Sequence, residues 1–291
     1  MASYSDWLEG ARIRTLPAAV APVIAGAGVA VTEGAFSWTR TLLAALVALF
    51  LQIGVNFSND YSDGVRGTDE HRSGPPRLTG GGKATPSTVL AVAFGFFFAA
   101  AVAGLALVAL CGQWWLLICG VVAILAAWFY TGGKNPYGYL GLGEIFVLVF
   151  FGYMATVGTV YTQSGTAPLL AWVIATAIGL IACALLMINN IRDIPTDLQS
   201  GKRTLAVRLG DRVARLSFVA MLVVPPVITA FIGFFTYPLL ITTLLLLVVV
   251  PVMSRPVLVG ARGRALIVVL RNTGFYELAY AVLITLLLVL S

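Results

Sequence analysis

The fold is decided by the stretch "LLAALVALFLQIGVNFSNDYSDG", residues 42–64, in which an apolar run passes directly into a polar one. Its first fourteen residues, up to Val55, hold a single polar side chain, Gln52. A helix that crosses a hydrocarbon core of about 30 Å needs roughly twenty predominantly apolar residues. The stretch therefore predicts a membrane-spanning helix whose end carries amides and carboxylates. These are Asn56, Asn59, Asp60 and Asp63.

The whole chain has the composition of a helical membrane protein. Of its 291 residues, 59% are apolar and 10% are charged, and the mean hydropathy is +0.96, whereas soluble domains are about half apolar and about a quarter charged. Continuous apolar runs favour helices over the alternating strands of a β-barrel. We predict one all-α domain over residues 1–291 with nine transmembrane helices. The segments are 15–32, 41–58, 88–111, 114–131, 143–162, 168–190, 213–235, 237–254 and 272–290.

Lys and Arg gather on one side of the predicted membrane. With the nine segments in alternation, 17 of the 18 basic residues fall on the side of the N-terminus, and Arg40 falls opposite. Because cytoplasmic loops are enriched in Lys and Arg, we expect the N-terminus in the cytoplasm and the C-terminus outside a cell membrane. The same rule accounts for the net charge of +6, so no nucleic-acid partner is expected.

One group of acids lies at the end of the opening stretch. If its helix continues past residue 58, Asn56, Asp60 and Asp63 lie at i, i+4 and i+7 on one face. Oxygen ligands of this kind suit Mg²⁺, which takes one or two carboxylates and completes its shell with water and substrate phosphate. We expect the carboxylate of Asp60 to lie outside the packed apolar interior.

The stretch "NNIRDIPTD", residues 189–197, repeats this arrangement at the end of another apolar segment. Asn189, Asp193 and Asp197 lie at i, i+4 and i+8. Pro195 is expected to disturb the last turn and leave Asp197 on a loop. Two such sets at one membrane depth would form a wall that suits hard divalent cations, although solvated loops that balance nearby arginines would have the same composition.

Basic residues follow both acidic groups. The loop "RSGPPRLTGGGK" contains Arg77 and Lys83, and "GKRTLAVRLG" contains Lys202 and Arg203. Cations of two kinds, metal and side chain, at one membrane face suit a bound polyanion. A diphosphate fits this arrangement.

Four stretches carry a family resemblance: "RIRTLPAAVAPVIAGAG" from Arg12, "NDYSDGVRGTD" from Asn59, "YTGGKNPYGYLGLGEIFVLVFFG" from Tyr130 and "NNIRDIPTDLQSGKRTLAVRLG" from Asn189. Together they resemble the UbiA superfamily of intramembrane aromatic prenyltransferases, over residues 10–212. Many members carry an Asp where this chain has Gly67, and the next acid here is Asp69. This shift is typical of the branch that uses 1,4-dihydroxy-2-naphthoate, and it leaves open whether Asp69 contacts metal.

The resemblance implies a nine-helix bundle around a central cavity, with a cytoplasmic active site and a lateral route from the membrane lipid. The family joins a polyprenyl diphosphate to an aromatic ring with Mg²⁺ on the diphosphate. In the naphthoate branch the acceptor loses CO₂, and the product is demethylmenaquinone, in menaquinone biosynthesis.

The resemblance also assigns roles to residues of this chain. Metal ligands are expected at Asn56, Asp60, Asp63, Asn189, Asp193 and Asp197. Catalysis is expected to depend on Asp60, Asp63, Asp193, Asp197 and Lys202. Substrate binding is expected from Asn59, Arg77, Lys83, Tyr130, Lys134, Tyr139, Asn190 and Arg203. Aromatic faces that shield an allylic cation are expected among Tyr130, Tyr137, Tyr139, Phe57 and Tyr61.

Two alternatives stay open from the sequence. The first alternative stays within the superfamily: the acceptor would be 4-hydroxybenzoate or homogentisate, or the isoprenoid would be transferred to a haem or chlorin. In another class, a secondary transporter of an anionic solute would also have many helices and a basic inner face, although its charges would lie near the midplane of the membrane.

One acid lies inside the last apolar segment. Glu277 is expected either to be functional, as intramembrane acids usually are, or to pair with Arg271 six residues earlier.

Overall fold

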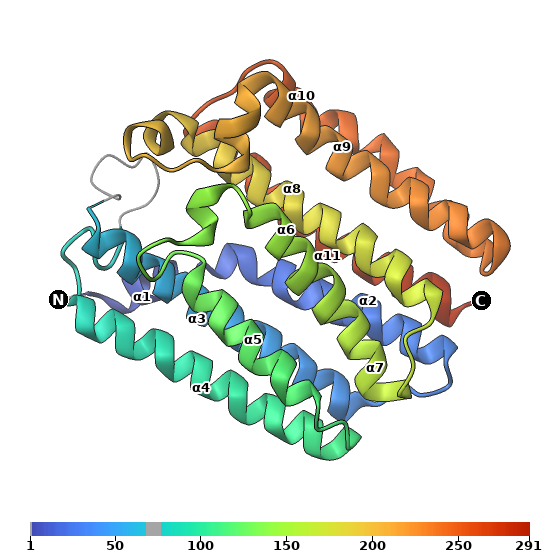
Figure 1. The fold of residues 1–291 in the computed structure, drawn as a ribbon. Coiled ribbons are helices and arrows are strands. Elements are labelled where there is room, and N and C mark those ends of the chain that lie inside the picture. Colours follow the sequence, from blue (N-terminus) through green and yellow to red (C-terminus); the bar gives the residue numbers. More distant parts are fainter. Residues whose placement is uncertain (1, 68–76) are drawn as a thin grey trace.

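The computed structural model describes residues 2–67 and 77–291, which form a bundle of helices along one common direction (Figure 1). Asp69 lies outside the described residues. In chain order the elements are α1 (Tyr4–Gly10), η1 (Ile13–Thr15), α2 (Leu16–Thr32), α3 (Trp38–Val65), α4 (Pro86–Cys111), α5 (Leu116–Phe129), η2 (Tyr137–Leu140), α6 (Gly143–Val147), η3 (Leu148–Val157), α7 (Gly158–Ser164), α8 (Leu169–Gln199), α9 (Leu205–Phe235), η4 (Pro238–Val248), α10 (Val250–Leu258) and α11 (Arg264–Val289).

Seven described helices are long and apolar enough to cross a membrane: α3, α4, the continuous helix of α6, η3 and α7, α8, α9, the helix of η4 and α10, and α11. Two shorter apolar helices, α2 and α5, coincide with the predicted segments 15–32 and 114–131. The predicted all-helical membrane fold is therefore confirmed, while the crossing of all nine segments stays a prediction.

Helices α3 and α8 extend beyond the apolar segments that predicted them. The segment predicted to end at residue 58 continues to Val65, and the one predicted to end at residue 190 continues to Gln199. Each extension is polar, so hydropathy gives no sign of it. The polar groups of both stretches consequently lie on helices of fixed direction.

Pro195 does not break α8, and the prediction that Asp197 lies on a loop is wrong. Proline removes one N–H donor from a helix. The turn that follows is held by backbone hydrogen bonds from Ser200 to the Thr196 carbonyl, at 3.0 Å, and from Lys202 to the Asp197 carbonyl, at 2.9 Å.

Helix α8 is the central helix of the bundle. Of its most apolar stretch 61% is buried, against 44% or less in the other six long helices. It packs against α9, η3, α11 and α2, and Figure 1 shows it running through the middle of the molecule. Because protein surrounds most of α8, the side chains at its polar end are fixed relative to several neighbours.

The π-helix η3 approaches α8 closely at two glycines. A Cβ atom on Gly179 of α8 would lie 2.6 Å from the Leu148 side chain and 2.9 Å from the Cα atom of Gly152 in η3. A Cβ atom on Gly152 would lie 2.8 Å from the carbonyl oxygen of Ala175. Small residues permit such close backbone contact between helices in membranes, and the contact fixes η3 against α8.

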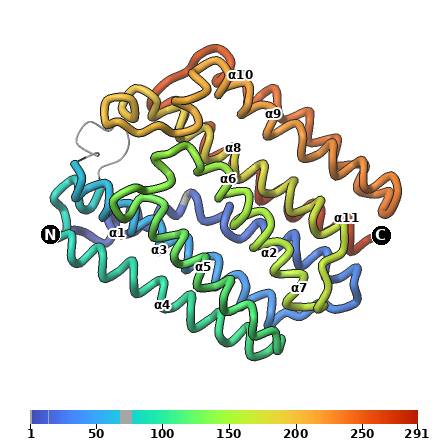
Figure 2. The backbone as a smooth tube through the Cα atoms, in the orientation of Figure 1, coloured from blue at the N-terminus to red at the C-terminus, as the bar shows by residue number. Residues whose placement is uncertain are grey.

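The two ends of the bundle differ. Figure 2 shows the N- and C-termini at opposite ends, and the connections 130–142 and 200–204 lie at the end that carries α1 (Figure 1). At the other end, Arg40 donates to the carbonyl oxygens of Leu110 and Gln163, at 2.9 and 3.0 Å. The basic residue that falls opposite the others therefore ties helix ends together.

Gly179→Ala should lower the thermal unfolding midpoint of the purified protein in detergent, because overpacking of a filled site costs about 1–3 kcal/mol. Gly95→Ala, in α4, is the matched control, since a Cβ atom there meets nothing within 4 Å. Its midpoint should stay level or rise, because alanine is about 0.5–1 kcal/mol better than glycine inside a helix. A Gly179→Ala midpoint at or above that of the wild type would contradict the close packing of η3 on α8.

Candidate active site

A cavity of about 1000 Å³ lies within the bundle, walled mainly by α3, α4, α5, α8 and the helix from α6 to α7. Its charged lining residues are Asp63 at the end of α3, Asp193 and Asp197 at the end of α8, Lys202 in the α8–α9 connection, and Arg12 and Arg77. Eleven of the fifteen predicted site residues line it. They are Asn56, Asn59, Asp63, Arg77, Tyr130, Tyr139, Asn189, Asn190, Asp193, Asp197 and Lys202.

Helix α8 contributes a stripe of four lining residues that changes in character with depth. Leu186, Asn190, Asp193 and Asp197 are spaced by four, three and four positions, which keeps them on one helix face. At about 1.5 Å per residue, charge near the mouth gives way to a neutral amide and then to apolar side chains. The cavity is therefore layered along α8.

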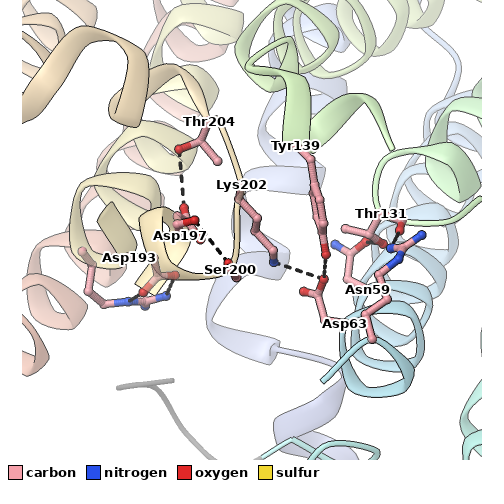
Figure 3. Close-up of polar contacts among 11 residues, drawn as sticks. Asn59, Asp63, Thr131, Tyr139, Asp193, Asp197, Ser200, Lys202 and Thr204 are labelled. Atoms are coloured by element: carbon pink, nitrogen blue, oxygen red, sulfur yellow. Dashed lines mark hydrogen bonds and ion pairs between the residues drawn. The ribbon is translucent and has the colours of Figure 1, made fainter. Parts of the chain in front are cut away.

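The carboxylate of Asp63 joins three separate elements at the mouth (Figure 3). Its Oδ1 accepts a hydrogen bond from the Tyr139 hydroxyl at 2.5 Å and forms an ion pair with Lys202 Nζ at 3.2 Å. The same ammonium lies 4.4 Å from the centre of the Tyr139 ring, within cation–π range. The end of α3, the α5–α6 connection and the α8–α9 connection consequently meet at one charged cluster.

Lys202 keeps its charge in this partly enclosed position. Burial by itself lowers the pKa of an ammonium. Here the neighbouring Asp63, Tyr139 and Asp197 outweigh that effect and raise the pKa of Lys202 above its ordinary value. A permanent cation therefore lies at the cavity mouth.

Asp197 and Asp193 differ in how firmly they are held. Asp197 Oδ2 accepts a long hydrogen bond of 3.4 Å from the Thr204 hydroxyl. Both oxygens of Asp193 accept from Arg192, at 2.6 and 2.7 Å, and the same guanidinium donates to Asn189 Oδ1 at 2.8 Å. Arg192 was not among the predicted site residues, although it lies inside the quoted acidic motif.

Asp60 is packed inside the protein, so the expectation that its carboxylate lies outside the interior is wrong. It is 0% exposed, and its two oxygens accept hydrogen bonds from the backbone amides of Leu78 and Thr79, at 3.0 and 2.8 Å. It does not line the cavity, in contrast to Asp63. The observed contacts of Asp60 anchor the turn that follows residue 77.

The amides of α3 are also partly engaged by protein. Asn56 donates from Nδ2 to the Ala11 carbonyl at 2.9 Å, and Asn59 accepts at Oδ1 from the Thr131 hydroxyl at 2.7 Å. Both line the cavity. They tie the N-terminal segment and the α5–α6 connection to α3, whatever further ligand they bind.

Three predicted basic residues lie away from the cavity. Lys83 pairs with Asp6 of α1 at 2.5 Å, and the salt bridge lowers the pKa of the Asp6 carboxyl. Lys134 and Arg203 are exposed. The backbone N–H of Arg203 donates to the Tyr139 carbonyl at 2.9 Å, so its main chain positions the charged cluster. Their predicted contact with substrate stays a prediction.

The predicted aromatic residues divide into two groups. Tyr130 and Tyr137 line the cavity and pack edge to face, with ring centroids 5.5 Å apart. Tyr137 stacks at 3.8 Å on Phe146, a lining residue that was not predicted. Phe57 packs on Trp7 instead, and Tyr61 on Trp128; neither lines the cavity.

Two buried acids lie in the helices around the cavity. The expected pairing of Glu277 with Arg271 is wrong, because Glu277 is 0% exposed and its carboxylate oxygens have no hydrogen-bond partner among residues 2–67 and 77–291. Glu144 was missed by the sequence reasoning. It lies in the quoted "GLGEIF" run, where an acid at the start of an apolar segment was the available sign.

The donor set fits a divalent metal that a substrate helps to bind. Within the described part of the chain, no three acidic, histidine or cysteine side chains are grouped closely enough to hold a metal by themselves. Asp63, Asp193 and Asp197 nevertheless face one cavity from two helix ends. Mg²⁺ commonly uses one or two carboxylates together with water and substrate phosphate, which these oxygens suit.

Comparison with known proteins agrees with this geometry. The chain is 47% identical over 287 residues to the "1,4-dihydroxy-2-naphthoate octaprenyltransferase" of Mycobacterium tuberculosis, covering 97% of this chain and 96% of that protein. It is 44% identical over 215 residues to the protein of the same name from Escherichia coli, covering 72% and 70%.

A solved structure has the same fold. The structure of a UbiA homolog from Archaeoglobus fulgidus bound to DMAPP and Mg²⁺ matches with a TM-score of 0.64, covering 95% of this chain and 99% of that one at 13% identity. At this identity the likeness speaks for the fold alone.

The family match takes in the parts of the chain that form the cavity. Residues 19–265 match the UbiA prenyltransferase family, and this range includes the ends of α3 and α8 and both connections at the mouth. With nearly half of its residues identical to a named prenyltransferase over almost its whole length, the chain belongs to the UbiA prenyltransferase family.

Proposed function

We propose that this membrane prenyltransferase transfers a polyprenyl group from polyprenyl diphosphate to 1,4-dihydroxy-2-naphthoate, with loss of CO₂ and release of diphosphate, to give the hydroquinone form of demethylmenaquinone. The curated relatives named for this reaction support the choice of acceptor. The observation that carries the proposal is the layered cavity, in which Asp63, Asp193 and Lys202 line the mouth above an apolar interior.

This layering matches the two parts of the donor substrate. A diphosphate is highly charged and needs cations, while its polyprenyl chain is apolar and gains about 25 cal/mol per Å² of surface removed from water. The charged mouth suits the first part and the apolar wall the second. A transporter of an anionic solute is excluded, because the chain belongs to a family of prenyltransferases.

Mg²⁺ is the proposed cofactor, held by oxygens of Asp63, Asp193 and Asp197 with help from Asn56 and Asn189. When bound, it would neutralise the diphosphate and stabilise the charge that develops as the allylic C–O bond ionises. Asp60 was predicted as a further ligand, and its two hydrogen bonds to backbone amides favour a supporting role that keeps the adjacent loop in place.

Basic side chains of the chain assist at the mouth. Lys202, which remains protonated, and Arg77 line the cavity beside the carboxylates. Cations already oriented toward a leaving group stabilise it without reorganisation during the reaction. We assign Lys202 to the diphosphate, since its attachment to Asp63 and Tyr139 fixes it at the mouth, and Arg77 to the diphosphate or the acceptor carboxylate.

The walls protect the reactive carbon from water. Tyr130, Tyr137 and Phe146 are aromatic residues that line the cavity, and aromatic rings stabilise a nearby cation. An electron-rich dihydroxynaphthoate attacks an allylic cation without a strong base, and the carboxylate leaves as CO₂ when ring aromaticity is restored. The chain's part is to bring the two substrates together in a dry pocket.

Orientation completes the proposal. The chain is one domain whose nine apolar segments, including the shorter α2 and α5, all cross the membrane. The N-terminus and the cavity mouth face the cytoplasm, in keeping with the distribution of Lys and Arg. The opposite ends taken by the termini agree with an odd number of crossings.

Asp197→Asn should reduce turnover by about a hundredfold or more, since loss of one electrostatic contact of this kind costs about that factor. The side-chain hydrogen bond that Asp197 accepts from Thr204 survives in the amide, so the unfolding midpoint should stay close to that of the wild type. Asp60→Asn should lower both turnover and midpoint, because it loosens the turn at Leu78. Rates measured across a Mg²⁺ titration test this, and a normal rate for Asp197→Asn without extra Mg²⁺ would contradict the metal assignment.

The acceptor is tested by labelled CO₂. With Mg²⁺, a polyprenyl diphosphate and carboxyl-labelled 1,4-dihydroxy-2-naphthoate, the purified protein should release one labelled CO₂ for each prenylated product. Turnover of 4-hydroxybenzoate and homogentisate should be poor or absent. Retention of the label in the product, or preferential use of a monocyclic acceptor, would move the protein to another branch of the family.

Orientation is tested by labelling single cysteines in intact cells, in a background without Cys111, Cys119 and Cys183. Lys134→Cys, exposed in the α5–α6 connection, should be protected from a membrane-impermeant maleimide. Thr166→Cys, exposed at the other end, should react. Permeabilised cells provide the control in which both react, and the reverse pattern in intact cells would place the active site outside.

A further inference from the structure

Glu144 is a buried acid to which the proposed reaction gives no role. It lies in the first turn of α6 and is 5% exposed. Its Oε1 accepts a hydrogen bond of 3.1 Å from Asn190 Nδ2, while Oε2 is buried without a partner among the described residues. A buried acid held by one hydrogen bond needs an explanation, because such groups are usually satisfied.

Helix α8 fixes Glu144 in two ways. The thiol of Cys183 donates to the main-chain carbonyl of Glu144 at 3.1 Å, and Asn190, seven residues further along the same helix face, donates to its side chain. Glu144 does not line the cavity, whereas Asn190 does. The carboxylate therefore lies behind the cavity wall, and the side-chain amide of Asn190 lies between the carboxylate and the cavity.

This contact decides which atom of Asn190 faces the cavity. Nδ2 of Asn190 is the atom that lies against Glu144, where it donates to the acceptor oxygen Oε1. The amide oxygen Oδ1 then points away, and it has no hydrogen-bond partner within residues 2–67 and 77–291. Glu144 thereby sets a hydrogen-bond acceptor at the wall of the cavity, about one helical turn below Asp193.

The chemistry of an acceptor atom selects what binds there. A diphosphate carries only acceptor oxygens and would be repelled, and a polyprenyl chain has no polar hydrogen to donate. A hydroxyl on an aromatic ring does donate. Leu186, Tyr130 and Phe146 also line the cavity. A Cβ atom on Gly143, next to Glu144, would lie 3.6 Å from the Tyr130 ring, so aromatic surface lies close to the Glu144–Asn190 pair.

We propose that Glu144 is a positioning residue for the aromatic acceptor: it orients Asn190 so that the amide oxygen accepts a hydrogen bond from one ring hydroxyl. This inference rests on the proposed function. It places the acceptor hydroxyl in the neutral layer of the cavity, below the charged mouth that takes the diphosphate. The two substrates then occupy different depths beside the α8 stripe.

The test separates the acceptor from the diphosphate substrate. Glu144→Leu should raise the KM for 1,4-dihydroxy-2-naphthoate about three- to tenfold, the value of one hydrogen bond. The KM for polyprenyl diphosphate and the Mg²⁺ requirement should change less than about twofold. Neither depends on the hydrogen bond between the acceptor hydroxyl and Asn190. Glu144→Gln keeps an oxygen that accepts from Asn190 and should restore most of the affinity. Glu33→Leu, at an exposed position, is the matched control.

Substrate analogues identify the hydrogen bond itself. Inhibition constants for 1-hydroxy-2-naphthoate and 4-hydroxy-2-naphthoate do not require turnover. For the analogue that lacks the recognised hydroxyl, wild type and Glu144→Leu should bind equally. For the other analogue, the variant should bind about three- to tenfold more weakly. Equal losses for both analogues would contradict recognition of one hydroxyl.

A second variant guards against misfolding. Glu144→Leu leaves the Asn190 amide unpaired, whereas the double variant Glu144→Leu/Asn190→Leu replaces both polar partners and avoids that cost. It should show the same weak acceptor binding and the same loss of discrimination between the analogues. Parallel changes in both substrate KM values, or a raised Mg²⁺ requirement, would overturn the proposal in favour of a structural or metal-binding role. Absence of naphthoate prenylation by the wild type would instead refute the proposed function.

Discussion

The ion pair between Lys202 and Asp63 organises the site. It joins the end of α3 to the connection after α8, and Tyr139 brings a third element to the same carboxylate. Charges in a partly dry position persist only when they are paired and hydrogen-bonded. Because these two charges must be paired, segments about 140 residues apart in the chain lie in contact. That contact forms the mouth of the cavity.

Similar charged residues serve different purposes because of what they contact. Asp63 lies on the cavity wall, whereas both carboxylate oxygens of Asp60, three residues earlier, accept hydrogen bonds from the backbone amides of a turn. Arg40 ties helix ends at the far end of the bundle. Some charged residues of this chain therefore only hold the chain, whereas Asp63 and Lys202 both hold the chain and line the cavity.

The two buried acids illustrate the same distinction. Glu277 has no partner among the described residues, while Glu144 is held by Asn190 on the wall of the cavity. Both are single acids within apolar segments, and in the sequence they look alike. They differ in their contact with the α8 stripe. Glu144 accepts a hydrogen bond from Asn190, which belongs to that stripe, and the stripe continues to the charged mouth. An acid that is hydrogen-bonded to a residue lining the cavity can influence binding in that cavity.

The sequence by itself determined the membrane class, the positions of the apolar helices and eleven of the side chains that line the cavity, because hydropathy and helical spacing are local properties. It placed Asp63 and Asp193 at the ends of two helices, and both residues line one cavity. Only the tertiary structure decided that Asp60 faces a turn, that Lys83 pairs with Asp6, and that α8 continues through Pro195. Those outcomes depend on which groups, distant along the chain, are available as hydrogen-bond and ion-pair partners, and a local pattern carries no information about them.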